Sequence, residues 1–164
     1  IAKIKSMNAA RKKEEVESIA SANAELSAYH ISKLIGSGCY GAVFLGKHTL
    51  SGRHVAIKRV QPFDDAEDAL RLLREVRILK AVKGHPHILN LIEVLIPSSD
   101  PDFENVWIVT EALQTDLHRI LYNKEIGRNE RLSVQVCLRY FWQLMAGCEH
   151  LHSLGLVHRD LKPS

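Results

Sequence analysis

A closely spaced set of glycines in the first third of the chain constrains its fold more than any other feature. The spacing is Gly36-x-Gly38-x-x-Gly41-x-Val43. Glycine suits a phosphate-binding turn because no side chain keeps the backbone amides away from the phosphate oxygens. In dinucleotide-binding folds a helix follows such glycines, whereas the residues that follow here, 42–48, are typical of a strand. The pattern therefore favours a hairpin, either a flap over nucleotide phosphates or a plain glycine hairpin.

The residues on both sides of these glycines predict an antiparallel sheet. Runs of β-branched and apolar residues predict five strands, at residues 29–35, 42–48, 53–60, 91–96 and 105–110. Turn residues at 36–38 and 50–52 separate the first three strands, which indicates a meander. Residues 1–28 are rich in Ala, Ser, Lys and Glu and contain no aromatic residue, so we expect a helical or disordered leader there.

The predicted third strand carries a lysine at a position that chemistry could use. It contains the sequence Val55-Ala56-Ile57-Lys58. Side chains alternate along a strand, so Ala56 and Lys58 share one face and the two β-branched residues share the other. Lys58 can therefore point toward phosphate groups while Ala56 lies above a base. Taken alone, such a lysine could equally be a surface residue on a half-exposed strand.

The helix that follows carries a glutamate near its apolar face. It is predicted to begin at residue 64 or 65 and to end near residue 80. Its apolar stripe consists of Ala69, Leu72, Val76 and Leu79. Glu75 lies on or beside this stripe, and because an unpaired buried carboxylate is costly, Lys58 is its candidate partner. The alternative is a surface pair between Glu75 and either Arg71 or the neighbourhood of Lys80.

The second half of the chain predicts two helices. Residues 111–114 form a strand-to-helix linker. Thr115 is the predicted cap of a short helix and Ser133 that of a longer one, which Gly155 ends. The apolar stripe of the longer helix is Val134, Cys137, Leu138, Phe141, Leu144, Met145 and Cys148. Because this stripe repeats every three or four residues, we expect both of its cysteines to be core residues rather than reactive ones.

The end of the chain resembles the catalytic loop of the protein kinases. Its sequence is His158-Arg159-Asp160-Leu161-Lys162-Pro163. Kinases also carry the glycine spacing, the Val-Ala-Ile-Lys strand and the helix glutamate in the order seen here. From about residue 29 to residue 164 the chain therefore resembles a eukaryotic protein kinase. Lys162, which follows Asp160 by two residues, resembles the serine/threonine branch of that family.

Several segments resemble the mitogen-activated protein kinases within this branch. They are residues 73–79, 97–105, 115–118 and 162–164. Cyclin-dependent kinases are near relatives and are the alternative within the class. A Thr-x-Tyr sequence in the activation loop would separate the two groups, and that loop is not among these 164 residues.

The resemblance implies an α+β fold of the protein-kinase type. Residues 29–110 would form the small lobe, a five-stranded antiparallel sheet with one helix. Residues 111–114 would be the hinge, and residues 115–164 would be the first helices of an incomplete α-helical large lobe. Residues 1–28 would precede the small lobe as a leader.

The resemblance also implies ATP-dependent phosphoryl transfer to Ser or Thr residues of protein substrates. Asp160 would orient the substrate hydroxyl and accept its proton, and Lys162 and Lys58 would stabilise phosphate charge. Glu75 would hold Lys58 on the phosphates through an ion pair. The implied nucleotide-binding residues are Ile35, Gly36, Gly38, Gly41, Val43, Ala56, Lys58, Glu111, Leu113 and Asp116.

The resemblance places the protein ligands of Mg²⁺ beyond Ser164, on an Asn and on the Asp of an Asp-Phe-Gly motif. The sequence itself shows no metal-ligating pattern. Because the chain begins with Ile1 and ends within a motif, we expect a fragment that is catalytically inactive and binds ATP weakly. The alternative is a natural truncated kinase homologue that acts as a nucleotide- or protein-binding module.

Charge and cysteine content narrow the expected partners. The 22 Lys and Arg and 19 Asp and Glu residues give a net charge of +3, which is too small to indicate nucleic-acid or membrane binding. The 3 scattered cysteines favour a reducing compartment, the cytoplasm or also the nucleus. We therefore expect ATP, protein substrates and, by the resemblance, an upstream activating kinase as partners.

Overall fold

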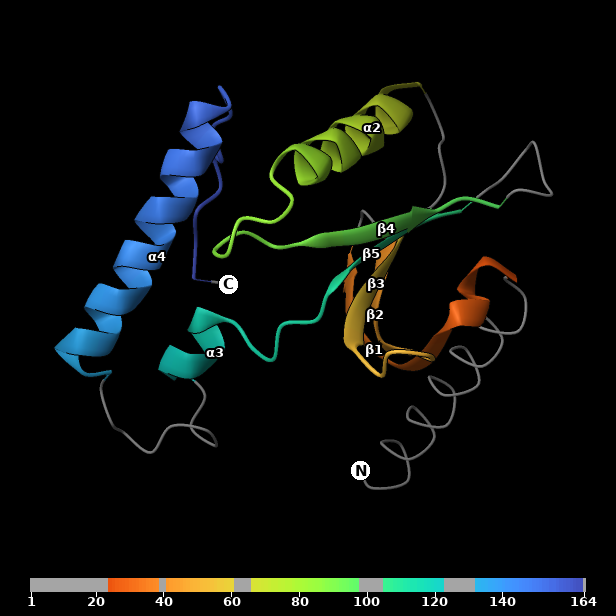
Figure 1. The fold of residues 1–164 in the computed structure, drawn as a ribbon, viewed down its shortest axis with the longest axis horizontal. Coiled ribbons are helices and arrows are strands. Elements are labelled where there is room, and N and C mark those ends of the chain that lie inside the picture. The colour runs from red at the N-terminus through yellow and green to blue at the C-terminus, as the bar shows by residue number, and fades with distance from the viewer. Residues whose placement is uncertain (1–23, 39–40, 61–65, 98–104, 123–131, 164) are drawn as a thin grey trace. The chain divides into compact units, whose positions relative to one another are not determined.

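The computed structural model describes residues 24–38, 41–60, 66–97, 105–122 and 132–163 (Figure 1). The chain divides into two compact units. The sheet unit comprises Ile1–Ile78 and Leu91–Ala112, and the helical unit comprises Leu79–Asn90 and Leu113–Ser164. In the part of the chain that the structure describes, no helix is long and apolar enough to cross a membrane.

The sheet unit contains a five-stranded antiparallel sheet with the strand order β1-β2-β3-β5-β4. The strands are β1 (Tyr29–Gly38), β2 (Gly41–His48), β3 (His54–Val60), β4 (Leu91–Leu95) and β5 (Val106–Glu111). The predicted α+β class and the five strands are confirmed. The last strand in sequence, β5, lies between β3 and β4, and its residues 106–110 are all buried. A central strand that is covered on both faces needs apolar residues on both, which explains the continuous apolar run in this part of the sequence.

The glycine-rich segment belongs to the strands rather than to the turn. The prediction of a turn at residues 36–38 was wrong, because Gly36 pairs with Val43 and Gly38 pairs with Gly41 across the β1–β2 ladder. A register shift between Leu34 and Gly36 marks an irregularity where the first glycine enters. Glycine has no side chain that opposes such an irregularity, so the ladder continues through it. The connecting residues 39–40 lie outside the described part of the chain.

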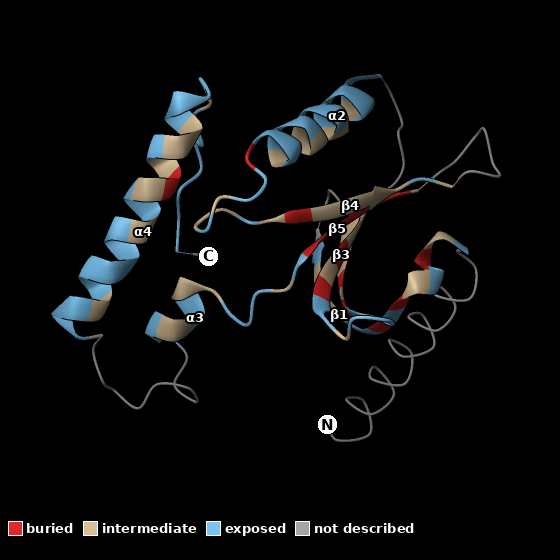
Figure 2. Cartoon of the chain, in the orientation of Figure 1, coloured by how far each residue is buried: buried red, intermediate tan, exposed pale blue. Residues whose placement is uncertain are grey.

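The core of the sheet unit includes a residue from the predicted leader. Its buried members are Leu26, Tyr29, Ile31, Phe44, Val55, Ile57, Trp107 and Val109, coloured red in Figure 2. Leu26 is only 1% exposed and lies in the short 3-10 helix η1 (Ala24–Ala28). The folded unit therefore begins before the predicted boundary at residue 29. Burying a leucine side chain contributes roughly 2 kcal/mol, enough to anchor this turn.

A hydrogen bond joins the two edge strands of the sheet. The Tyr29 hydroxyl on β1 donates to Glu93 Oε1 on β4. Burial is the main cause that raises the pKa of Tyr29, and its hydrogen bond to Glu93 and the charge of that carboxylate add to it. For the two edges to meet in this way, the sheet must curl strongly about its core.

The helix of the sheet unit, α2 (Ala66–Ala81), is less buried than predicted. Leu72, Val76 and Leu79 are half-buried, but Ala69 is exposed and no residue of the helix is fully buried. Leu70 and Leu73, on the opposite side of the helix, are exposed. The predicted start at residue 64 or 65 lies outside the described residues.

The caps of the two helices in the helical unit were predicted with mixed success. In α4 (Val134–Ser153) the amide of Val136 donates to Ser133 Oγ over 3.3 Å, so the predicted cap is confirmed. The helix ends at Ser153, and Gly155, two residues later, has a φ of +72°. For α3 (Leu117–Tyr122) the prediction was wrong, because the cap is Asp116 and not Thr115. The amide of Arg119 donates to Asp116 Oδ1 over 2.7 Å.

The apolar stripe of α4 is largely exposed. Cys137 is exposed and Cys148 is half-buried, so the prediction that both are core residues was wrong. Exposed members of the stripe are Val134, Leu138, Phe141, Leu144 and Met145. Gly147 is the one fully buried residue of the helix. Periodicity correctly located the stripe, but it does not supply the element that would cover it.

Gly41 offers a test of the β2–β3 packing. A Cβ atom built on Gly41 would lie 1.9 Å from the carbonyl oxygen of Arg59, and the residue has a φ of +117°. We expect Gly41→Ala to lower the free energy of unfolding by about 3 kcal/mol or more, measured by urea denaturation. Gly52→Ala is the control, because Gly52 also has a positive φ but its Cβ would meet only the flexible end of Lys47. That variant should lose about 1 kcal/mol. Equal losses in the two variants would contradict this account.

The bond between Tyr29 and Glu93 gives a second stability prediction. Tyr29→Phe removes a hydroxyl that donates to a carboxylate, and we expect a loss of about 1–3 kcal/mol in the free energy of unfolding. Tyr122→Phe, at a site where the side chain is 68% exposed, should change stability by less than about 0.5 kcal/mol. Thermal denaturation followed by circular dichroism would measure both. If Tyr29→Phe is as stable as the original protein, the bond does not help to close the sheet.

Candidate active site

Lys58 and Glu75 form a close ion pair in the sheet unit. Lys58 Nζ donates to both carboxylate oxygens of Glu75, at 2.7 and 2.8 Å. The predicted pairing is confirmed. Arg71, the alternative partner, forms ion pairs with Glu67 at 2.8 Å and Asp68 at 3.0 Å on the exposed side of α2.

The ammonium group of Lys58 is only partly covered. The side chain of Lys58 is 27% exposed and that of Glu75 is 40% exposed. Glu75 therefore fixes the direction of the lysine without removing it from solvent. An ammonium group has three donors, so one held by a carboxylate can also bind a phosphate oxygen.

The alternation of β3 decides which residues surround Lys58. Val55 and Ile57 are buried on one face, whereas Ala56 and Lys58 are half-buried on the other, as the sequence predicted. In the register of the sheet, Lys58 lies opposite Val43 on β2. Residues that lie directly opposite each other across antiparallel strands share a face.

A row of predicted site residues therefore crosses three strands. Gly36 on β1 is opposite Val43 on β2, and Val43 is opposite Lys58 on β3. A Cβ atom on Gly36 would lie 3.8 Å from Val43 Cβ, which is ordinary van der Waals contact, so the two residues are direct neighbours on this face. Ile35, immediately before the row, is 43% exposed. The sheet thus brings together a cation, an apolar surface and glycine backbone.

Gly41 is also needed for the packing of β2 against β3. Its side-chain space is taken by the backbone of β3 at Arg59, so glycine is required there for packing between strands. The sequence reasoning had explained this glycine by approach to phosphate. Close backbone packing and phosphate approach both demand glycine, and the pattern alone does not separate them.

Ile108 is a neighbour of the row that the sequence reasoning missed. It lies opposite Lys58 on β5 and is buried, whereas Thr110 lies opposite Ala56 and is also buried. These two residues continue the face of the row toward the centre of the sheet. Strand alternation could have selected Ile108 only if the register between β3 and β5 had been known.

The predicted hinge residues lie at the end of β5 and beyond it. Glu111 is the last residue of β5 and lies opposite Val55. Leu113 is 70% exposed and lies outside regular structure. In the helical unit, Asp116 caps α3 and its Oδ2 lies 3.3 Å from Arg119 Nε. The carboxylate of Asp116 is thus occupied by its own helix, and its predicted role at the nucleotide stays a prediction.

The predicted catalytic residues of the helical unit form their own exposed cluster. Asp160 Oδ2 lies 2.9 Å from Lys162 Nζ, and the amide of Asp160 donates to His158 Nδ1 over 3.2 Å. Arg159 adopts a φ of 62°, the left-handed region that residues other than glycine rarely occupy. The segment is tied to α3 because the amide of His118 donates to the carbonyl of Pro163 over 2.8 Å. The backbone at Arg159 and the hydrogen bond at Pro163 restrain the segment that carries Asp160.

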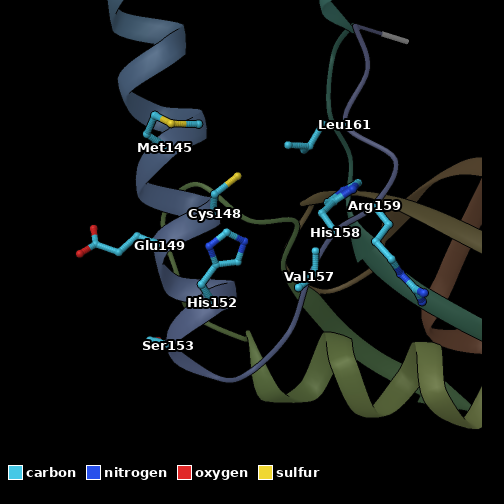
Figure 3. Close-up of a pocket in the computed structure, with 9 residues that line it drawn as sticks. All are labelled: Met145, Cys148, Glu149, His152, Ser153, Val157, His158, Arg159 and Leu161. Atoms are coloured by element: carbon cyan, nitrogen blue, oxygen red, sulfur yellow. The ribbon is translucent and has the colours of Figure 1, made fainter.

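An open pocket of about 700 Å³ separates this segment from α4 (Figure 3). Its lining residues on α4 are Met145, Cys148, Glu149, His152 and Ser153, and on the C-terminal segment they are Val157, His158, Arg159 and Leu161. Asp160 is not among the lining residues. Among the described residues, no group of three or more His, Cys, Asp or Glu side chains could hold a metal ion.

Comparison with known proteins identifies the family. The family model described as "Protein kinase domain" matches residues 29–164. The chain belongs to the protein kinase domain family. The prediction made from the motifs is therefore confirmed.

Relatives of this kinase domain are mitogen-activated protein kinases. It is 40% identical over 137 residues to extracellular signal-regulated kinase 1 of Dictyostelium discoideum, a match that covers 83% of the chain and 25% of the relative. It is 38% identical over 136 residues to mitogen-activated protein kinase spk1 of Schizosaccharomyces pombe, with 83% of the chain and 35% of the relative covered. Mitogen-activated protein kinase 17 of Oryza sativa subsp. japonica is 34% identical over 140 residues, 85% of the chain and 23% of that relative. The kinase domain thus resembles the mitogen-activated type and spans about a quarter to a third of the length of these relatives.

The Lys58–Glu75 pair of the kinase domain should contribute little to stability. Because both side chains are partly exposed, we expect Lys58→Met to lower the free energy of unfolding by no more than about 1 kcal/mol. Arg71→Met, which breaks ion pairs on the same helix, is the matched control and should lower the free energy of unfolding by a similar amount. Urea denaturation would measure both variants. A loss above about 3 kcal/mol for Lys58→Met alone would instead show a pair that supports the fold.

Proposed function

We propose that the protein transfers the γ-phosphate of ATP to serine or threonine hydroxyls of protein substrates. The ion pair of Lys58 with Glu75, on the same sheet face as Val43 and beside Gly36, is the observation that carries this proposal. Membership of the protein kinase domain family supports it, and that family in general uses ATP and Mg²⁺.

The sheet unit supplies the contacts to the nucleotide. ATP brings the transferable phosphoryl group. The ammonium group of Lys58, directed by Glu75, binds the phosphate oxygens through charge-assisted hydrogen bonds. Backbone amides at Gly36, Gly38 and Gly41 lie over the phosphates. The remaining proposed contacts from this unit are apolar or backbone contacts from Ile35, Val43, Ala56 and Glu111. Leu113 and Asp116, which belong to the helical unit, are proposed to add a backbone contact and a polar contact.

The helical unit supplies the groups that act on the substrate hydroxyl. Asp160 orients that hydroxyl and accepts its proton, and Lys162, 2.9 Å from the Asp160 carboxylate, offsets negative charge on the transferred phosphoryl group. Both side chains are exposed and so are accessible to a protein substrate. We propose no role in Mg²⁺ binding for the described residues.

The relatives support a place in a phosphorylation cascade. Because they are mitogen-activated protein kinases, we infer protein substrates and an upstream activating kinase as partners. Cys137 and Cys148 are free thiols, as proteins of the reducing cytoplasm or nucleus carry them, and we propose that compartment.

ATP binding is the direct test of the nucleotide site. We expect Lys58→Met to weaken Mg-ATP binding about 10- to 100-fold in isothermal titration calorimetry, because it removes charge-assisted hydrogen bonds to phosphate. Lys47→Met is the matched control, since Lys47 is an exposed lysine on the adjacent strand β2. Equal binding by Lys58→Met and the original protein would overturn the assignment of the nucleotide site.

An assay of phosphoryl transfer distinguishes an enzyme from a nucleotide-binding module. Transfer of labelled γ-phosphate to a Ser- and Thr-containing protein would be measured on the protein with any residues that follow Ser164. We expect Asp160→Asn to abolish transfer and to leave ATP binding intact, whereas Asp68→Asn on the surface of α2 should change neither. ATP binding without any transfer by the unaltered protein would identify a nucleotide-binding module instead.

A further inference from the structure

A cluster of histidines joins the segment after α2 to α4 within the helical unit. The rings of His85 and His150 are stacked, with centroids 4.6 Å apart and planes inclined by 13°. His87 meets His85 edge to face, with centroids 5.8 Å apart, and meets Trp142 of α4 at 5.3 Å. Four aromatic rings from two separate stretches of the chain therefore form one continuous contact.

This cluster lies beside the closest backbone approach of α4. A Cβ atom on Gly147 would lie 3.2 Å from the carbonyl oxygen of His87 and 3.6 Å from Ile88 Cγ1. Gly147 is also the one fully buried residue of α4. Most of the rest of the helix is exposed, so the contact with residues 82–88 covers its best-buried part. A change in the histidine contact therefore acts where the helix is held.

The charge of the stacked pair depends on pH. Burial lowers the pKa of His85, and the imidazoles of His150 and His87 lower it further. Two stacked imidazoles attract each other when neutral, but two imidazolium rings at this separation repel each other. The cause of the lowered pKa and the stacked geometry thus agree that this contact favours the neutral form.

Charged residues flank the cluster on both stretches of the chain. Lys80 in the last turn of α2 and Lys83 on the segment after it are positively charged. On α4 the flanking residues are Glu149 and His152, and these two side chains line the open pocket in Figure 3.

We propose that His85 and His150 form a pH-sensitive clamp, which holds residues 82–88 against α4 while both imidazoles are neutral and releases them when both are protonated. The clamp is independent of the proposed phosphoryl transfer, since it uses none of the residues assigned to that reaction. Its consequence is that acidification loosens the packing that positions α4, the helix that leads to Asp160.

The direction of the pH effect follows from proton linkage. The folded state binds the proton at His85 less readily than the unfolded state, whose reference pKa is 6.5. Stability therefore rises with pH through this region, and the stabilisation by the clamp is present above pH 6.5 and is lost as the pH falls below it.

Hydrogen exchange at residues 82–88 reports the opening of the clamp directly. The amides of His85 and Ile88 donate to the carbonyls of Val82 and His85 within this segment, both over 3.3 Å, and loss of the packing against α4 allows these hydrogen bonds to open. After correction for intrinsic exchange rates, we expect exchange of this segment to rise several-fold as the pH falls from about 7.5 to about 5.5. In His150→Phe, which keeps an aromatic ring but removes its charge, this rise should be lost. His152→Phe, on the same helix but outside the stack, should behave like the original protein.

A titration of the unaltered protein keeps the proposal testable if a variant does not fold. The imidazole protons of His85, followed by nuclear magnetic resonance, should titrate with a midpoint below 6.5. In His150→Phe the midpoint should move upward, and in His152→Phe it should stay. Exchange of residues 82–88 that is independent of pH, or equally dependent on pH in His150→Phe, would overturn the proposal, as would an ordinary midpoint for His85.

Discussion

The pairing of β3 with β2 and β5 is the constraint on which the rest of the sheet unit depends. Backbone hydrogen bonds on both sides of β3 set the register that places Lys58 opposite Val43 and Ile108. A shift of one residue would turn Lys58 toward the core and expose Ile57, because side chains alternate along a strand. The burial of Val55 and Ile57 therefore determines the direction of Lys58. The candidate active site is a consequence of packing on the opposite face.

The ion pair of Lys58 and Glu75 is better understood as a positioning device than as a source of stability. Two partly exposed charges contribute at most about 1 kcal/mol, much less than the apolar core of the same unit. The pair instead orients the ammonium group of Lys58, because a bidentate contact to Glu75 limits the positions that this group can take. The same reasoning applies to Asp160 and Lys162, whose exposed contact is set by the backbone around Arg159. Catalysis by positioning and electrostatics needs this kind of restraint.

The helical unit has a different physical character. Its longest helix, α4, exposes most of its apolar stripe and is held at Gly147 and the histidine cluster. A few close contacts between titratable rings make this anchor sensitive to pH, whereas the apolar core of the sheet unit is not. The stability of the sheet unit therefore depends on side-chain volume and backbone fit in its core. The packing of the helical unit depends instead on the protonation of its histidines.

The sequence by itself determined the features that depend on near neighbours. These were the five strands, the alternation of Ala56 with Lys58, the Ser133 cap and the kinase motifs in their order. Periodicity and capping involve residues within a few positions of each other, so they can be read from one chain. The pairing of Lys58 with Glu75 was also predictable, because a glutamate beside an apolar helix face needs a cation.

Only the tertiary structure decided the features that join distant parts of the chain. It placed Leu26 in the core, set Gly41 against the backbone of Arg59, and bonded Tyr29 to Glu93. It also left Cys137 exposed, although its helical spacing had indicated burial. Each of these depends on which surface lies opposite, and that is set by register and by the packing of whole elements. Local sequence patterns specify which face of an element is apolar, but they do not specify what covers that face.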